Sequence, residues 1–109
     1  MPDYVMLMKL TEQGARDIDS APARIREAKD GFKALDGKLH SFYITMGAYD
    51  YVAIGTLPDD KAAAFFALAL SRLGNVRTET MPAFGEDVLE EMVVKLGATP
   101  MLHPVLSTT

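Results

Sequence analysis

The stretch KLHSFYITMGAYDYVAIGTL, residues 38–57, decides the fold because it holds two strand-like segments around one turn signal. Residues 38–46 and residues 49–57 are rich in β-branched and aromatic side chains, which are typical of strands. Only Gly47 and Ala48 separate the two segments, so the sequence predicts a tight β-hairpin.

Helix-like and strand-like segments alternate on both sides of this hairpin. Ser20 and Pro22 are typical of a helix start, and Gly37 is typical of a left-handed helix stop. An acidic cap at Asp59 and Asp60 predicts the start of a second helix. Further strands are expected over residues 4–10 and 76–81, a turn over 11–14, and helices over 22–35, 62–73 and 86–96. The order β-α-β-β-α-β-α predicts a ferredoxin-like α+β domain with a four-stranded antiparallel sheet.

Composition limits the class of protein and its partners. The chain has 109 residues, of which 49% are hydrophobic and 24% charged, as expected for one globular domain over residues 1–96 with a tail over 97–109. The net charge of −4 and the scattered basic residues argue against nucleic acid or an anionic membrane as the main partner. No apolar run is long enough to span a bilayer and the N-terminus does not resemble a signal peptide, so we expect a cytoplasmic protein.

Alternation along the strands predicts which side chains share a face of the sheet. We assign Phe42, Ile44, Val52 and Ile54 to the face covered by two helices, because branched aliphatic side chains pack well under helices. The opposite face is then expected to carry Tyr43, Tyr49, Tyr51, at least one Met, and Arg77 with Glu79. A sheet face in contact with water should be polar, so we expect a second copy of the chain to cover this one and form a dimeric α+β barrel.

Four collinear segments resemble the GYD-domain family, which is named for a Gly-x-Tyr-Asp signature. The signature corresponds to GAYD at residues 47–50, and the other segments are LTEQG at 10–14, PDD at 58–60 and LGNVRTET at 73–80. The similarity runs from about residue 4 to residue 84, and the sequence has Met81-Pro82 where the family pattern has Leu-Arg. We therefore carry over no role for a basic group at that point.

The resemblance implies a ferredoxin-like fold in the dimeric α+β barrel superfamily, and small bacterial proteins that form oligomers. It implies no particular reaction. Relatives with the same fold include cofactor-free monooxygenases, haem-degrading enzymes, lactone isomerases and ligand-sensing domains of regulators, so the fold does not decide the function.

Three tyrosines are the first candidates for ligand binding. Tyr43, Tyr49 and Tyr51 could orient a small aromatic ligand, although tyrosine is also common in protein interfaces, and packing is the role we favour. Asp50 is adjacent to Tyr49 and points to the other face of a regular strand, so the two do not form a simple acid–base pair. An aspartate near a turn commonly binds backbone amides, and we expect this of Asp50 in preference to a role as a functional carboxylate.

Arg77 and Glu79 are two residues apart on one strand and therefore share a face. They could anchor an anionic ligand and supply a base, but cross-strand ion pairs within or between chains are the commoner role for such residues. With no cysteine and two isolated histidines, His40 and His103, the sequence predicts no metal site, and we expect no cofactor.

These observations lead to one main hypothesis and two alternatives. The main hypothesis is a homo-oligomer that associates through its sheet face, with a modest cavity between sheet and helices and a small-molecule site in the barrel. The alternatives are a cofactor-independent monooxygenase or isomerase for a small apolar or aromatic substrate, and a non-catalytic ligand-sensing or interaction module.

Overall fold

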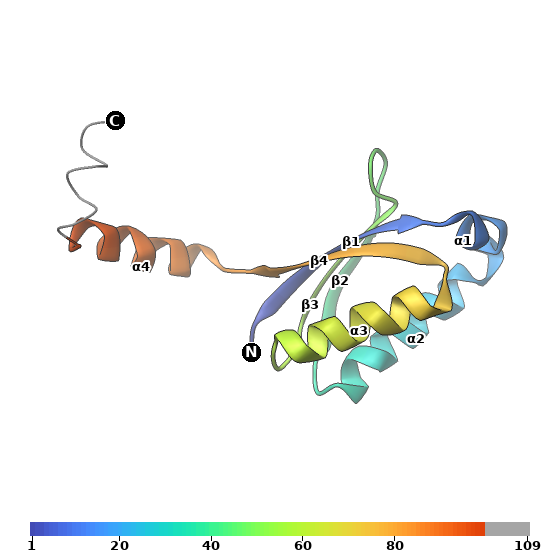
Figure 1. The fold of residues 1–109 in the computed structure, drawn as a ribbon, viewed down its shortest axis with the longest axis horizontal. Coiled ribbons are helices and arrows are strands. Elements are labelled where there is room, and N and C mark those ends of the chain that lie inside the picture. Colours follow the sequence, from blue (N-terminus) through green and yellow to red (C-terminus); the bar gives the residue numbers. More distant parts are fainter. Residues whose placement is uncertain (100–109) are drawn as a thin grey trace.

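The chain folds as a sheet covered on one side by two helices, with a further helix at the C-terminal end (Figure 1). The structure is a computed structural model, and it describes residues 1–99. The elements are β1 (Asp3–Leu10), α1 (Glu12–Arg16), the 3-10 turn η1 (Ile18–Ser20), α2 (Ala21–Ala34), β2 (Lys38–Ile44), β3 (Tyr51–Thr56), α3 (Asp60–Leu73), β4 (Val76–Ala83) and α4 (Glu86–Gly97). The predicted ferredoxin-like α+β fold is confirmed.

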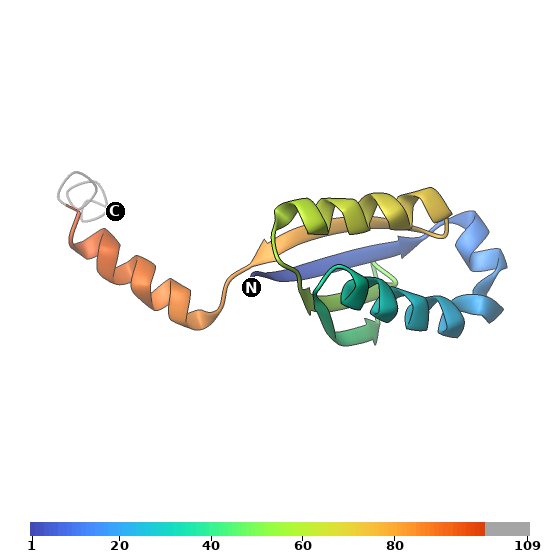
Figure 2. The ribbon, with the colours of Figure 1, turned by 90° about the horizontal axis from the view of Figure 1, so that it is seen from below.

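The four strands form one antiparallel sheet in the order β2-β3-β1-β4. Within residues 1–99, α2 and α3 cover one face of this sheet and leave the other uncovered (Figures 1 and 2). We call the uncovered side the open face. Sequence parity and strand pairing together decide which side chains belong to it.

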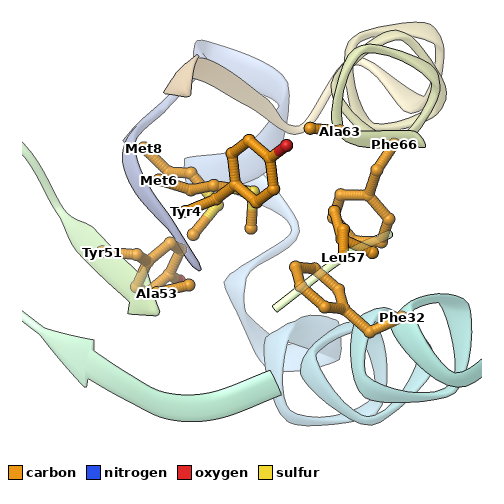
Figure 3. Close-up of a cluster of buried hydrophobic side chains, with 9 residues drawn as sticks. All are labelled: Tyr4, Met6, Met8, Phe32, Tyr51, Ala53, Leu57, Ala63 and Phe66. Atoms are coloured by element: carbon orange, nitrogen blue, oxygen red, sulfur yellow. The ribbon is translucent and has the colours of Figure 1, made fainter. Parts of the chain in front are cut away.

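The core lies between the sheet and the two helices (Figure 3). Phe32 from α2 and Phe66 from α3 meet edge to face, with ring centroids 4.6 Å apart. They lie over Tyr4, Met6 and other buried side chains of the sheet. The Tyr4 phenol donates a hydrogen bond of 2.6 Å to Oδ1 of Asp60, so the polar atom of this buried ring is paired. This layer joins the first strand to the start of α3.

The predicted assignment of β3 to the two faces is wrong. Tyr51 and Ala53 are buried under the helices, whereas Val52 and Ile54 belong to the open face. The reason is space at Gly55, because the ring of Phe32 lies directly over this residue. A Cβ on Gly55 would stand 2.4 Å from that ring, so only glycine fits under it, and Ala53 and Tyr51 share this face by alternation.

On β2 the predicted faces are correct for Phe42 and Tyr43, and Ile44 is the exception. Phe42 packs against the core, and Tyr43 lies on the open face opposite Val52. Ile44 is 80% exposed although it pairs with the buried Tyr51, because it is the last residue of β2 and the helices do not reach it.

The connection between β2 and β3 is longer than the predicted two-residue turn. It comprises residues 45–50, and Gly47 within it has a φ of +107°, which favours glycine. The backbone N–H of Thr45 donates to the carbonyl of Asp50, and the Thr45 hydroxyl donates to the carbonyl of Tyr49. These bonds close a wide loop and shift the start of β3 to Tyr51.

Two helix ends also differ from the prediction, whereas α3 agrees with it. Residues 11–14 belong mostly to α1 and not to a turn, and the left-handed residue after α2 is Asp36, with a φ of +61°, in place of Gly37. Asp59 caps α3 by accepting from the N–H of Ala62 at 2.9 Å, and α3 stops at Gly74 with a φ of +80°.

Helix α4 projects from the body as an arm (Figures 1 and 2). The molecule measures 56 × 31 × 20 Å with a radius of gyration of 17.9 Å, whereas a compact chain of this length would have about 13 Å. The helix lies where the sequence predicts it. Residues 100–109 of the predicted tail lie outside the described residues.

Candidate binding surfaces

The open face carries a contiguous apolar strip. Strand pairing places Val5 opposite both Ile54 and Met81, and it places Leu7 opposite Val52. We call these five residues the apolar strip. Met81 is 42% exposed and the other four are half-buried. The predicted apolar character of this face is therefore present, but aliphatic side chains supply more of it than tyrosines do.

A polar end adjoins the apolar strip at the start of β4. Lys9 lies opposite Arg77, and Glu79 lies opposite Leu7. Hydrogen bonding to the Glu79 carboxylate raises the pKa of the Tyr49 phenol, with partial loss of water and the charge of Glu79 adding to the effect. Neither Arg77 nor Glu79 belongs to an ion pair within residues 1–99, so the open face presents charges of both signs.

Asp50 serves the backbone, as we expected from its place near a turn. Its Oδ2 accepts a hydrogen bond of 2.8 Å from the N–H of Leu10, and its own N–H donates to the carbonyl of Met8 at 2.8 Å. The β2–β3 loop is thereby attached to the end of β1. The Asp50 carboxylate therefore holds the backbone of the loop and does not act together with the Tyr49 phenol.

Tyr51 does not share a surface with the other two tyrosines. It is 8% exposed, and its ring packs against Phe42 with centroids 5.2 Å apart. Of the six predicted site residues, Tyr43, Tyr49, Arg77 and Glu79 belong to the open face, with Tyr43 on the edge strand β2 and Arg77 and Glu79 on the opposite edge strand β4. Tyr51 belongs to the opposite side of the sheet.

Tyr51 instead lines a cavity between the two helices and the sheet, where the sequence predicts a modest cavity but not its lining residues. An open, mostly apolar groove of about 380 Å³ runs between α2 and α3 and reaches down to the sheet. Its walls include Ala28 and Gly31 of α2 and Ala69 of α3. Small residues on the facing sides of both helices leave this space open. The placement of these small residues along the two helices is the feature of the sequence that indicates the cavity. We call this cavity the helix groove.

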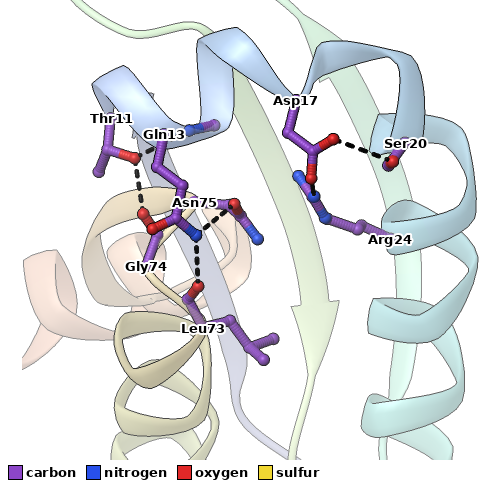
Figure 4. A network of polar contacts seen from close by, with 9 residues as sticks. Thr11, Gln13, Asp17, Ser20, Arg24, Leu73, Gly74 and Asn75 are labelled. Carbon is purple, nitrogen blue, oxygen red and sulfur yellow. Dashed lines mark hydrogen bonds and ion pairs between the residues drawn. The ribbon is translucent and has the colours of Figure 1, made fainter.

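Two of the motif-like segments meet at one end of the molecule (Figure 4). The Thr11 hydroxyl accepts from the N–H of Gly14 and donates to the carbonyl of Gly74 at 2.6 Å. The amide of Gln13 donates at 3.1 Å both to the carbonyl of Leu73 and to Oδ1 of Asn75. Residues 10–14 and 73–75 thus form a structural joint between α1 and the turn before β4.

The start of α2 is held differently from the predicted cap. The Ser20 side chain caps no backbone N–H of α2 and instead donates to Oδ1 of Asp17, which also pairs with Arg24 (Figure 4). An ion pair between an exposed and a partly exposed side chain adds little stability, so this contact mainly orients the chain before α2.

Metal-binding geometry is not found in the described part of the chain. No group of three or more His, Cys, Asp or Glu side chains within residues 1–99 is placed to hold an ion. His40 is exposed at a bulge in β2, and His103 lies outside the described residues. Among residues 1–99, no helix has the length and apolar character needed to cross a bilayer.

Comparison with known proteins gives a family. Residues 4–93 match the family described as the GYD domain. This chain belongs to the GYD domain family. The match continues nine residues past Phe84, where the resemblance in the sequence ended, and so includes part of α4.

A relative and a solved structure place this GYD domain among known proteins. It is 31% identical over 84 residues to the Thermus thermophilus protein named glutamine synthetase and cystathionine beta-lyase binding protein, over 76% of this chain and 88% of the relative. A crystal structure of a protein from the same organism is similar with a TM-score of 0.50 and 23% identity, over 78% of this chain and 95% of the other. That likeness supports the fold.

The signature residues of the GYD domain have identifiable places in this structure. Gly47 supplies the positive φ in the β2–β3 loop, and Asp50 fastens that loop to β1. Tyr49 lies between them and turns its phenol toward Glu79 on the open face. Two signature residues therefore build the loop, and the third lies on the open face.

Proposed function

We propose that this GYD domain is a binding module that associates with a second copy of itself through the open face. The observation that carries the proposal is the apolar strip of Val5, Leu7, Val52, Ile54 and Met81 on a sheet face without helices. An antiparallel sheet tolerates water on one face when that face is polar, and a contiguous apolar patch of this kind marks an interaction surface.

The polar end supports association between identical chains in particular. Lys9 and Arg77 are cationic, Glu79 is anionic, and all three lie on the same face as the apolar strip. A two-fold axis brings the same patch of each copy together, so it can place a cation of one copy against a carboxylate of the other. The resulting face-to-face pair of sheets is the dimeric α+β barrel that we expected from the sequence.

The name of the Thermus relative supports a role in protein binding. That protein is named for binding two enzymes, glutamine synthetase and cystathionine beta-lyase. By analogy, an enzyme partner of this chain would use a surface that remains exposed after self-association. We also propose that the protein is bacterial and cytoplasmic, which fits such a role.

Self-association is tested with charge substitutions on the open face. Tyr43 is 57% exposed and Met81 is 42% exposed, so Tyr43→Asp and Met81→Asp leave the core intact. Light scattering coupled to size-exclusion chromatography should show an oligomer of the 11.9 kDa chain at micromolar concentration and a lower mass for both variants. Leu68→Asp is the control, because Leu68 is 71% exposed on α3, on the other layer of the molecule.

Two results would overturn this assignment. One is an unmodified chain that remains a monomer at micromolar concentration. The other is an oligomer that Tyr43→Asp and Met81→Asp leave intact, because the interface would then lie elsewhere.

A second candidate function is the binding of a small anionic aromatic molecule between the two sheets. The arrangement that favours it is the polar end, where Tyr49 and Glu79 stand next to the cationic Arg77 and Lys9. Aromatic and apolar walls with a few polar groups are typical of ligand sites. Tyr49 would contribute a wall, whereas Tyr43 lies on the opposite edge strand, and Tyr51 and Asp50 are excluded by their positions.

This second function is tested by native mass spectrometry of protein purified from its own host. A small molecule that remains bound to the unmodified chain and is lost in Arg77→Met would support it. Arg72→Met on α3 is the control, since Arg72 is an exposed arginine away from the open face. Retention of the molecule by Arg77→Met would contradict a site at the polar end.

A further inference from the structure

Helix α4 carries an apolar side that its own chain does not cover. Leu89, Met92, Val93 and Leu96 recur at helical spacing and are between 40% and 60% exposed. Side chains of this kind on a monomeric helix would be expected to face a core. Figure 1 instead shows α4 as an arm that stands apart from the sheet and its two helices.

The helix groove is another uncovered apolar feature within residues 1–99. Its rim includes Phe65 and Leu73 of α3, which are 61% and 58% exposed. An α4 of 12 residues is about 18 Å long, and the α3 wall of 14 residues is about 21 Å long. A helix of this size can therefore lie along the groove.

The groove and the arm of one chain lie at different ends of the sheet. The groove reaches Leu10 and Val76, where β4 begins, whereas α4 starts three residues after Ala83, where β4 ends. The eight residues of β4 span about 26 Å between these points. The arm points away from the body in both views, so a groove on another molecule is the better placed receptor (Figures 1 and 2).

The charges on the arm and on the groove walls are complementary. Helix α4 carries four carboxylates and one lysine. Helix α2 carries four basic and two acidic side chains, and α3 carries two basic and one acidic. The walls are therefore net positive and the arm is net negative, which favours their approach and selects the partner.

We propose that the apolar side of α4 docks in the helix groove of a second copy of this chain. The net negative charge of α4 then lies close to the net positive charge of the partner's α2 and α3. The contact uses neither the apolar strip nor the polar end. It is therefore independent of association through the open face and can hold when that association fails.

Disulfide trapping tests the docking directly, because the natural chain contains no cysteine. A chain with Met92→Cys is mixed with a longer, tagged chain carrying Phe65→Cys and exposed to a mild oxidant. Because each chain has one cysteine, a cross-linked product of intermediate size can form only between the two molecules. We expect this product to exceed that of either control pair at least several-fold.

Two matched controls separate docking from random collision. Val94→Cys is on the same helix but about 160° around it from Met92, and Val94 is 72% exposed. Leu68→Cys is on the same helix as Phe65, exposed, and outside the groove lining. Circular dichroism checks that each variant is folded, and Leu73→Cys replaces Phe65→Cys if that variant is not.

Two results would overturn the proposal. The first is a yield for Met92→Cys with Phe65→Cys, or with Leu73→Cys in its place, that equals the yields of the controls. The second is preferential cross-linking of Met92→Cys to a chain carrying Tyr43→Cys, because the arm would then cover the open face. The same cross-linking is repeated with Tyr43→Asp in both chains. A higher yield of Met92→Cys with Phe65→Cys than of the control pairs would show that α4 docks in the groove without the face-to-face association.

Discussion

Gly14 lies against the backbone of Asn75, so closely that a Cβ on Gly14 would stand 2.0 Å from the Asn75 carbonyl oxygen. The N–H of Thr11 donates to this same oxygen at 3.1 Å. The first turn of α1 and the turn before β4 are therefore in direct backbone contact. This contact gives the segment that carries Gly14 a structural role.

Gly14→Ala is expected to destabilise the fold by about 1–3 kcal/mol, because a methyl group would force apart two backbone segments that cannot move independently. Thermal unfolding followed by circular dichroism measures the effect. Gly97→Ala is the control, since a Cβ there meets nothing within 4 Å and alanine favours a helix. Equal melting temperatures for Gly14→Ala and the unmodified chain would contradict the close contact.

Tyr4→Phe is expected to destabilise the protein by removing the hydrogen bond to Asp60, at a cost of about 1–2 kcal/mol. Burial, followed by the hydrogen bond to Asp60 and the nearby acidic charges, raises the pKa of Tyr4 from 10.0 to about 12. Ionisation therefore favours the unfolded chain when the pH lies between these two values, because the unfolded phenol loses its proton first.

The pH dependence of Tyr4→Phe follows from this sign. Below pH 10.0 the phenol is protonated in both states, and its stabilising contribution is fully present. Between pH 10.0 and about 12 the contribution is lost, so the unmodified chain and Tyr4→Phe should converge in melting temperature. A difference that stays constant across this range would show that Tyr4 titrates normally in the folded protein.

Asp50→Ala is expected to destabilise the β2–β3 loop by about 1–2 kcal/mol, because the N–H of Leu10 loses its acceptor. Asp50→Asn keeps an oxygen at the same place and should recover most of the loss. Hydrogen exchange at Leu10, measured by NMR, reports the bond directly and should speed up in the alanine variant only. Slow exchange in both variants would mean that another group accepts this hydrogen.

Much of the fold followed from local signals in the chain. Asp59 and Gly74 mark the two ends of α3, because a capping carboxylate and a glycine that tolerates positive φ each act within one turn of the helix. The backbone role of Asp50 was predictable for the same reason. The loop at Gly47 was misjudged in length, because its extent depends on contacts with β1 that are distant in sequence.

Only the tertiary structure shows which side chains of β3 face the helices and which lie on the open face. Alternation identifies which residues share a face but does not say which face the helices will cover. That choice depended on Phe32, which comes from α2 and needs the space over Gly55. Tyr51 therefore lies in the core and Val52 on the open face, which moved one predicted site residue away from the others.

The sequence by itself determined the order of the elements, the ferredoxin-like α+β class and the apolar side of the last helix. These features depend on periodicity, capping and turn residues that act over a few positions. The tertiary structure decided that this helix stands apart as an arm and that small residues of α2 and α3 leave a groove between them. Both depend on how separate elements fill space together, which no local pattern contains.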